Sequence, residues 1–198
     1  HEKIQDYKGK KRYFSDRKEI LKSILKKNRS LFKDLRLNII QEKTKILPKN
    51  INFNKACIDS KEIKKNDIFF AIKGKKNDGN KFIAQAFSKK ASLAIVNKIN
   101  KKNNIKHQIK IKDTLKFLTE SSKIFRENIN TKIIAITGSC GKTTLKELLG
   151  SSLEKVSTVS ISPKSYNNKY GVPLSLFNLD QKDNYGVLEL GMDKKGEI

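Results

Sequence analysis

The 198-residue sequence has few cysteines, few arginines and no long apolar run, and each shortage narrows the kind of protein it can be. Its two cysteines, Cys57 and Cys140, lie far apart and form no C-x-x-C pair, which is typical of a reducing compartment. No apolar run reaches membrane-spanning length, and no signal-peptide pattern is visible. We therefore expect a cytoplasmic protein without a transmembrane segment.

The net charge of +24 raises the question of nucleic-acid binding. The basic residues are nearly all lysines, spread over the whole chain together with asparagine, and no basic run alternates with aromatic residues at a stacking distance. Few arginines are available for bidentate contacts to bases or phosphates. We interpret the charge mainly as solvated surface and expect no nucleic-acid partner. A basic nucleic-acid-binding module with an incidental phosphate loop remains the alternative.

Residues 132–144 have the order strand, glycine-containing turn and helix start. An apolar run is followed by the pattern G-x-x-G-K-T-T, whereas the first glycine of the longer G-x-x-x-x-G-K-[ST] loop would fall at Ile136. Two glycines let the backbone N–H groups turn toward one concavity, and the helix start adds its unpaired N–H groups. The predicted phosphate-binding residues are Gly138, Ser139, Cys140, Gly141, Lys142, Thr143 and Thr144. An ordinary strand–turn–helix is the alternative.

Two later segments carry further polar side chains. Asn167 and Asn168 precede Gly-Val-Pro at 171–173, a pattern typical of a turn that enters a helix. Glu189 stands in the apolar strand expected at 187–192, where a carboxylate is costly unless it is paired or bound to a cation. Ligands of parallel sheets lie at the carboxyl ends of strands, so we expect Glu189 to face the same Mg²⁺ as Thr143. A plain turn and an outward-facing glutamate are the alternatives.

Residues 29–112 have the pattern of a small α/β domain. We expect strands at 56–60, 67–72 and 92–96 and a helix around 82–87. Asp113 should cap the next helix, which connects to the nucleotide-binding part. The predicted fold class is α/β: a small domain followed by the start of a parallel-sheet, ATP-binding domain.

The segments 59–61, 67–74, 78–83, 138–144 and 167–173 together resemble the MurF type of the Mur ligase family. Lys61 and Asn80 depart from the D-S-R and D-G-H patterns usual there. The resemblance implies ATP-dependent amide formation that joins D-Ala-D-Ala to UDP-MurNAc-tripeptide through an acyl phosphate, with ATP and Mg²⁺ as cofactors. It implies catalytic roles for Lys142 and Glu189, magnesium ligation by Thr143 and Glu189, and substrate contacts from Ser60, Lys61, Asn167 and Asn168. We expect a monomer.

The N-terminal segment resembles a different member of the family. His1-Glu2-Lys3-Ile4-Gln5 and residues 14–19 are similar to the end of a MurE-type ligase, in which Glu2 would help to hold the incoming amino acid. A hairpin is expected from 4 to 14 and a helix from 16 to 27. We therefore expect an internal piece of a MurE–MurF fusion, with 1–28 as the upstream tail, 29–112 as the substrate domain and 113–198 as the connector and the start of the ATP-binding domain. Another Mur-type or folylpolyglutamate-type ligase is the alternative.

Overall fold

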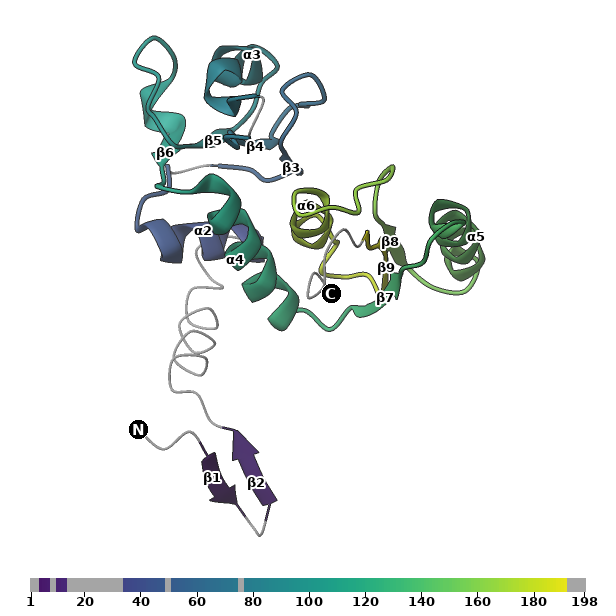
Figure 1. Ribbon diagram of the computed structural model, residues 1–198. Helices are drawn as coiled ribbons and strands as arrows, with labels where there is room; N and C mark the ends of the chain where they lie inside the picture. Colours follow the sequence, from purple (N-terminus) through teal and green to yellow (C-terminus); the bar gives the residue numbers. More distant parts are fainter. Residues whose placement is uncertain (1–3, 8–9, 14–33, 49–50, 75–76, 192–198) are drawn as a thin grey trace.

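The computed structural model describes residues 4–7, 10–13, 34–48, 51–74 and 77–191 (Figure 1). At the N-terminal end, β1 (Ile4–Tyr7) and β2 (Lys10–Tyr13) form the predicted antiparallel hairpin. The helix expected at 16–27 lies outside the described residues, and the assignment of residues 1–28 to an upstream ligase stays a prediction. The remaining elements build two parallel sheets with helices on their faces, which confirms the predicted α/β class.

A four-stranded parallel sheet forms the centre of the first part, in the order β3-β4-β5-β6. Its strands are β3 (Ala56–Cys57), β4 (Ile68–Phe70), β5 (Leu93–Val96) and β6 (Gln108–Lys110). Successive side chains enter different clusters, because Ile68 and Phe70 belong to one apolar core and Phe69 belongs to a second. Both faces are thus covered, which explains why β4 and β5 are apolar along their whole length.

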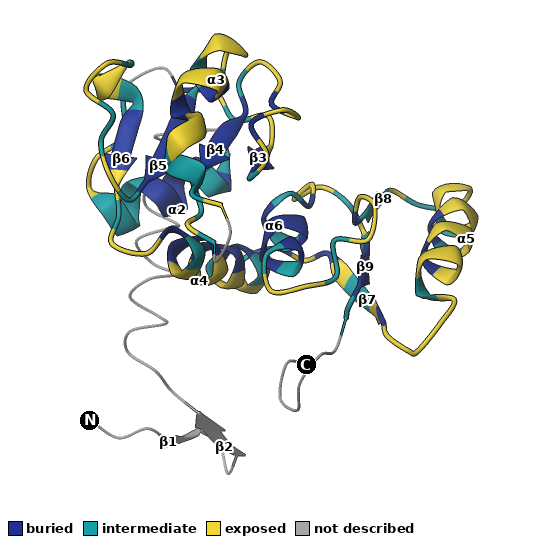
Figure 2. Ribbon diagram, turned by 45° about the horizontal axis from the view of Figure 1, so that its top comes forward, coloured by how far each residue is buried: buried dark blue, intermediate teal, exposed yellow. Residues whose placement is uncertain are grey.

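Helices cover both faces of this sheet (Figures 1 and 2). On the side of Phe69 lies α3 (Ile83–Ser88), preceded by the 3-10 turn η1 (Gly79–Phe82); a second 3-10 turn, η2 (Ile105–His107), leads into β6. On the other side lie α2 (Leu35–Thr44) and α4 (Thr114–Glu127). As predicted, Asp113 caps α4: its carboxylate accepts a hydrogen bond of 2.9 Å from the Lys116 N–H.

The second sheet has the parallel order β7-β9-β8. Its elements are β7 (Lys132–Ile136), α5 (Lys142–Glu154), β8 (Val159–Ile161), α6 (Gly171–Phe177) and β9 (Tyr185–Glu189). Helices α5 and α6 lie on opposite sides of this sheet (Figure 1). The carboxyl ends of β7 and β9 lie side by side, because their last residues, Ile136 and Glu189, pair with each other. The expected order of strand, glycine-containing turn and helix is confirmed, and the carboxyl edge of the sheet carries Glu189.

Phe177, at the end of α6, joins this second part to the core of the first. Its side chain is fully buried, and its ring meets those of Phe53, Phe70 and Phe125 edge-on at 5.9, 6.0 and 5.9 Å. Edge-to-face pairs of this kind add specific aromatic attraction to the burial of apolar surface. The two parts therefore share one hydrophobic core.

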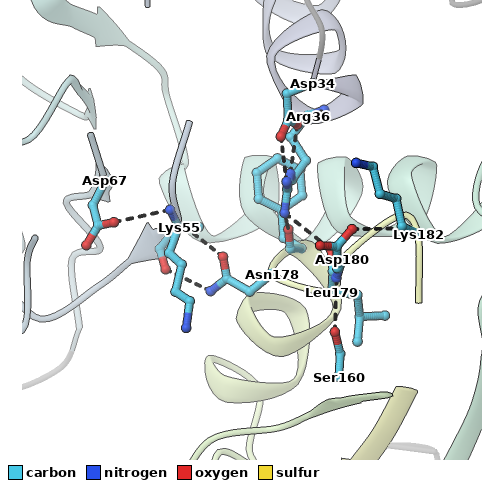
Figure 3. A network of polar contacts seen from close by, with 11 residues as sticks. Asp34, Arg36, Lys55, Asp67, Ser160, Asn178, Leu179, Asp180 and Lys182 are labelled. Atoms are coloured by element: carbon cyan, nitrogen blue, oxygen red, sulfur yellow. Dashed lines mark hydrogen bonds and ion pairs between the residues drawn. The ribbon is translucent and has the colours of Figure 1, made fainter. Parts of the chain in front are cut away.

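Polar contacts surround this aromatic cluster (Figure 3). Asp34 binds the guanidinium of Arg36 through both carboxylate oxygens, at 2.8 and 2.5 Å. The same guanidinium stacks 4.0 Å from the Phe53 ring centre and donates to the carbonyl of Leu179 at 3.2 Å. A cation is favourable there, because the last carbonyls of α6 carry the negative end of the helix dipole.

Candidate active site

The phosphate loop has the backbone that the sequence predicts. Gly138 and Gly141 have φ of 147° and 74°, a region that side chains disfavour, and α5 starts directly after them at Lys142. Lys142 extends its ammonium back over the loop and donates to the carbonyl of Gly138 at 2.7 Å. Ser139, Cys140 and Thr144 are exposed. The loop therefore presents backbone N–H groups, a helix start and one cation at the same place.

Glu189 lies beside this loop and is only 2% exposed. One carboxylate oxygen accepts a hydrogen bond of 2.8 Å from the Thr143 hydroxyl, and the other accepts one of 2.8 Å from the Asn167 amide. Among the described residues, no lysine or arginine forms an ion pair with this carboxylate. The structure thus brings together three of the residues singled out in the sequence, which come from α5, β9 and the loop between β8 and α6.

Residues 162–168, which we call the bridging loop, lie between β8 and α6 and include Asn167. The carbonyl of Asn167 accepts a hydrogen bond of 2.6 Å from the N–H of Gly191, where a Cβ atom would lie only 2.9 Å from that carbonyl oxygen. Asn168 has a different task, since its side-chain oxygen accepts hydrogen bonds of 3.0 Å from the N–H groups of Tyr170 and Gly171 at the start of α6. Both asparagines line a cleft of about 640 Å³.

The bridging loop also contacts the first part of the structure through Glu62. The Lys164 ammonium donates to one oxygen of this carboxylate, and the Tyr166 hydroxyl donates to the other at 3.1 Å. The hydrogen bond from Lys164 lowers the pKa of Glu62, while burial and the bond to Glu62 raise the pKa of Tyr166 to about 12. The sequence alone gives no sign of this contact, because it joins positions more than a hundred residues apart.

Ser60 and Lys61 lie next to Glu62, in the turn after β3. The strand predicted at 56–60 ends at Cys57, because Asp59 folds the chain by accepting a hydrogen bond of 2.8 Å from the Lys61 N–H. Ser60 is 5% exposed, and its hydroxyl donates to the Gln85 side chain at 2.6 Å. Lys61 is exposed. Of these two members of the predicted substrate set, Ser60 has a structural partner and Lys61 is accessible.

The donor set around Glu189 fits Mg²⁺, which prefers hard oxygen ligands and commonly keeps one or two protein ligands beside substrate phosphates. Thr143 and Glu189 supply a hydroxyl and a carboxylate next to the phosphate loop. In the described part of the chain, this buried carboxylate has only neutral side-chain partners, so a cation would stabilise it. Within the described ranges there is no group of three or more His, Cys, Asp or Glu that could hold a metal by itself.

Comparison with known proteins assigns this fold and site to a family. The model of the Mur ligase family catalytic domain matches residues 53–135, and that of the Mur ligase middle domain matches residues 136–197. Together they span both sheets and the phosphate loop. The chain belongs to the Mur ligase family, as the sequence resemblance predicted.

Individual relatives within this family are ligases of one type, named for D-alanyl-D-alanine or as MurF. The UDP-N-acetylmuramoyl-tripeptide--D-alanyl-D-alanine ligase of Haemophilus influenzae is 37% identical over 153 residues, which are 75% of this chain and 33% of that protein. A solved ligase structure from Acinetobacter baumannii, named for UDP-N-acetylmuramoylalanyl-D-glutamyl-2,6-diaminopimelate and D-alanyl-D-alanine, aligns with a TM-score of 0.68 and 32% identity over 81% of this chain and 37% of that chain. MurF from Thermotoga maritima, solved with ADP, aligns with a TM-score of 0.59 and 29% sequence identity. This alignment covers 76% of this chain and 35% of that chain. The chain thus spans about a third of the length of these relatives.

No helix in the part of the chain that the structure describes is long and apolar enough to cross a lipid bilayer.

Proposed function

We propose that the protein takes part in ATP-dependent formation of an amide bond between UDP-MurNAc-tripeptide and D-Ala-D-Ala. The names of the relatives support the choice of substrates, and the ADP-bound structure of the Thermotoga relative supports the choice of nucleotide. The γ-phosphoryl group of ATP passes to the tripeptide carboxylate, which gives an acyl phosphate and ADP. The amine of D-Ala-D-Ala then attacks the acyl carbon, forms the amide, and releases phosphate and a proton.

The observation that carries this proposal is the position of Glu189. It is a buried carboxylate between the phosphate-loop helix and the bridging loop, held by Thr143 and Asn167 at 2.8 Å each. A phosphate-binding protein that only needed an anion site would gain nothing from a buried carboxylate there, since it repels phosphate. An enzyme that binds its nucleotide together with a divalent cation does need one.

In this proposal Thr143 and Glu189 hold Mg²⁺, which when bound neutralises charge on the transferring phosphoryl group. Lys142 supplies the second positive charge. Its ammonium leaves the Gly138 carbonyl, 2.7 Å away, and turns to the phosphate oxygens, while the N–H groups of residues 138–144 bind the phosphates. Asn167 keeps the Glu189 carboxylate oriented toward the cation. These residues therefore position the phosphoryl group and stabilise its charge.

The substrate contacts follow from the same geometry. The turn with Ser60 and Lys61 is tied to the bridging loop through Glu62, so the two predicted substrate segments border one region between the domains. We assign the contact with an anionic or carbonyl group of the UDP-linked substrate to the exposed Lys61 and a supporting role to the buried Ser60. Asn167 and Asn168 line the 640 Å³ cleft.

The test is phosphate release by the complete gene product. We expect release to depend on UDP-MurNAc-tripeptide, ATP and D-Ala-D-Ala together. Lys142→Met removes the only cation of residues 138–144, and we expect it to lower the rate by about a hundredfold or more, the usual effect of losing one preorganised charge stabiliser. Lys155→Met, an exposed lysine just after the same helix, is the matched control and should keep the rate.

Two results would contradict the proposal. Release near the wild-type rate in Lys142→Met would show that the loop does not serve the reaction. Release that requires a free amino acid in place of D-Ala-D-Ala would place the protein in another branch of the family.

A further inference from the structure

Lys146 is a fully buried lysine that the proposed reaction does not use. It lies one turn after Lys142 on α5, and its side chain has 0% exposure. Apart from Gly150 it is the only buried residue of this helix, which is otherwise largely exposed (Figure 2). The exposed residues include Leu145 and Leu148. Burying an ammonium group is costly unless its hydrogen bonds are satisfied. We therefore expect specific hydrogen-bond partners for Lys146.

The partners of Lys146 are backbone carbonyls of the bridging loop. Its ammonium donates to the carbonyl of Ser162 at 2.9 Å and to that of Lys164 at 2.5 Å, and the Glu147 carboxylate lies 3.1 Å away. These three contacts match the three N–H donors of a lysine. Two of them fix carbonyls on either side of Pro163, at the start of the loop. Lys164 itself has a φ of 50°, a conformation that non-glycine residues adopt only when their surroundings hold them there.

The fixed loop carries side chains to both halves of the site. Lys164 and Tyr166 reach Glu62 in the first domain, and Asn167 reaches Glu189 beside the phosphate loop. We propose that Lys146 is a positioning residue: its ammonium fixes the bridging loop to the phosphate-loop helix, so that the substrate domain and the cation-binding carboxylate keep one relative placement. This inference rests on the proposed function and assigns Lys146 a role beyond it.

A buried ammonium suits this role because it holds two carbonyls by strong hydrogen bonds from one rigid point. An apolar side chain of the same length would fill the space and leave both carbonyls without partners. The loop would then be free to rearrange, and Asn167 would no longer hold Glu189 in one orientation. Replacing Lys146 should therefore act on the cation requirement of the reaction more than on the affinity for the nucleotide.

The experiment compares Lys146→Met and Lys146→Gln with the wild type and with Lys155→Met. The first readout is hydrogen–deuterium exchange followed by mass spectrometry. In Lys146→Met we expect amides of residues 162–168 to exchange at least about tenfold faster, while those of β4 and β5 keep their rates. Lys146→Gln keeps two N–H donors and should lie between the wild type and Lys146→Met.

The second readout is the Mg²⁺ dependence of phosphate release by the complete gene product. The half-saturating Mg²⁺ concentration should rise about tenfold or more in Lys146→Met, with less than about a threefold change in the KM for ATP at saturating Mg²⁺. A residue that served stability alone would lower the melting temperature and leave this concentration unchanged.

Four results would overturn the proposal: unchanged exchange in the bridging loop, equally faster exchange throughout the protein, loss of the whole fold in both variants, or an unchanged half-saturating Mg²⁺ concentration in Lys146→Met. If the wild type releases no phosphate with D-Ala-D-Ala but the bridging loop still loosens in Lys146→Met, the positioning role of Lys146 is supported and the proposed function fails instead.

Discussion

Phe177→Ala should weaken both parts of the protein at once. The ring is fully buried among Phe53, Phe70 and Phe125, and its removal leaves a cavity between the two sheets. Large-to-small changes of this kind cost about 3–5 kcal/mol, and the loss of three edge-to-face contacts favours the upper end of that range. For a chain of this size, each kcal/mol lowers the melting temperature by about 2–4 °C, so we expect a decrease of about 6–20 °C.

Differential scanning calorimetry measures this decrease directly. Because Phe177 belongs to a core that both parts share, the whole heat-absorption peak should move to lower temperature. The matched control is Phe82→Ala, which deletes the same ring from a position that is 42% exposed and should cost less than about 1 kcal/mol. If only one of two separate transitions moves, or if the shift is below about 2 °C, the two sheets do not share a core and our reasoning is wrong.

Two further predictions concern Gly191, which lies next to the site, and the buried thiol of Cys57. Gly191→Ala places a methyl group 2.9 Å from the Asn167 carbonyl oxygen, so the proposed release of phosphate by the complete gene product should slow by about tenfold or more. Gly74→Ala, where a methyl group meets nothing closer than 3.4 Å, should keep the wild-type rate. Equal rates in the two variants would contradict the role of Asn167. Burial raises the pKa of the Cys57 thiol to about 11 from an ordinary value of 9.0. The folded state therefore binds this proton more tightly, and the corresponding stability, on the order of 2 kcal/mol, is present below pH 9 and lost as the pH rises through 11. Denaturant unfolding of Cys57→Ala should lack this part of the pH dependence, whereas replacing the exposed Cys140 by Ser should leave it unchanged.

Local patterns in the sequence were sufficient to predict the phosphate loop and its carboxylate. Residues 132–144 encode their strand, turn and helix within one short segment, and Glu189 stands out as a single charge in an apolar strand. The structure places these elements side by side because parallel strands end at the same edge.

Contacts between distant segments could not be predicted in this way. In a chain with so many lysines, the sequence gives no reason to expect that Lys146 is buried. Only the fold shows that the Ser162 carbonyl accepts a hydrogen bond from its ammonium. The substrate contact expected of Ser60 stays a prediction, but nothing in the sequence indicates that its hydroxyl donates to Gln85, 25 residues away. Helix α2 was not assigned, because its apolar residues face the sheet and α4 without a clear helical period in the sequence.

The side chain of Asn178 forms the two backbone hydrogen bonds that a neighbouring strand would otherwise form. Its amide oxygen accepts from the Ala56 N–H at 2.7 Å, and its amide nitrogen donates to the Ala56 carbonyl at 2.8 Å (Figure 3). Ala56 belongs to β3, the outer strand of the first sheet. Unpaired outer strands are templates for pairing with other chains, and proteins suppress this aggregation by shortening or covering them. Strand β3 is only two residues long, and Asn178 of the second part occupies its free hydrogen-bonding positions. The contact between the two parts therefore also protects the sheet from edge-to-edge association, so a change that separates them should promote aggregation as well as inactivation.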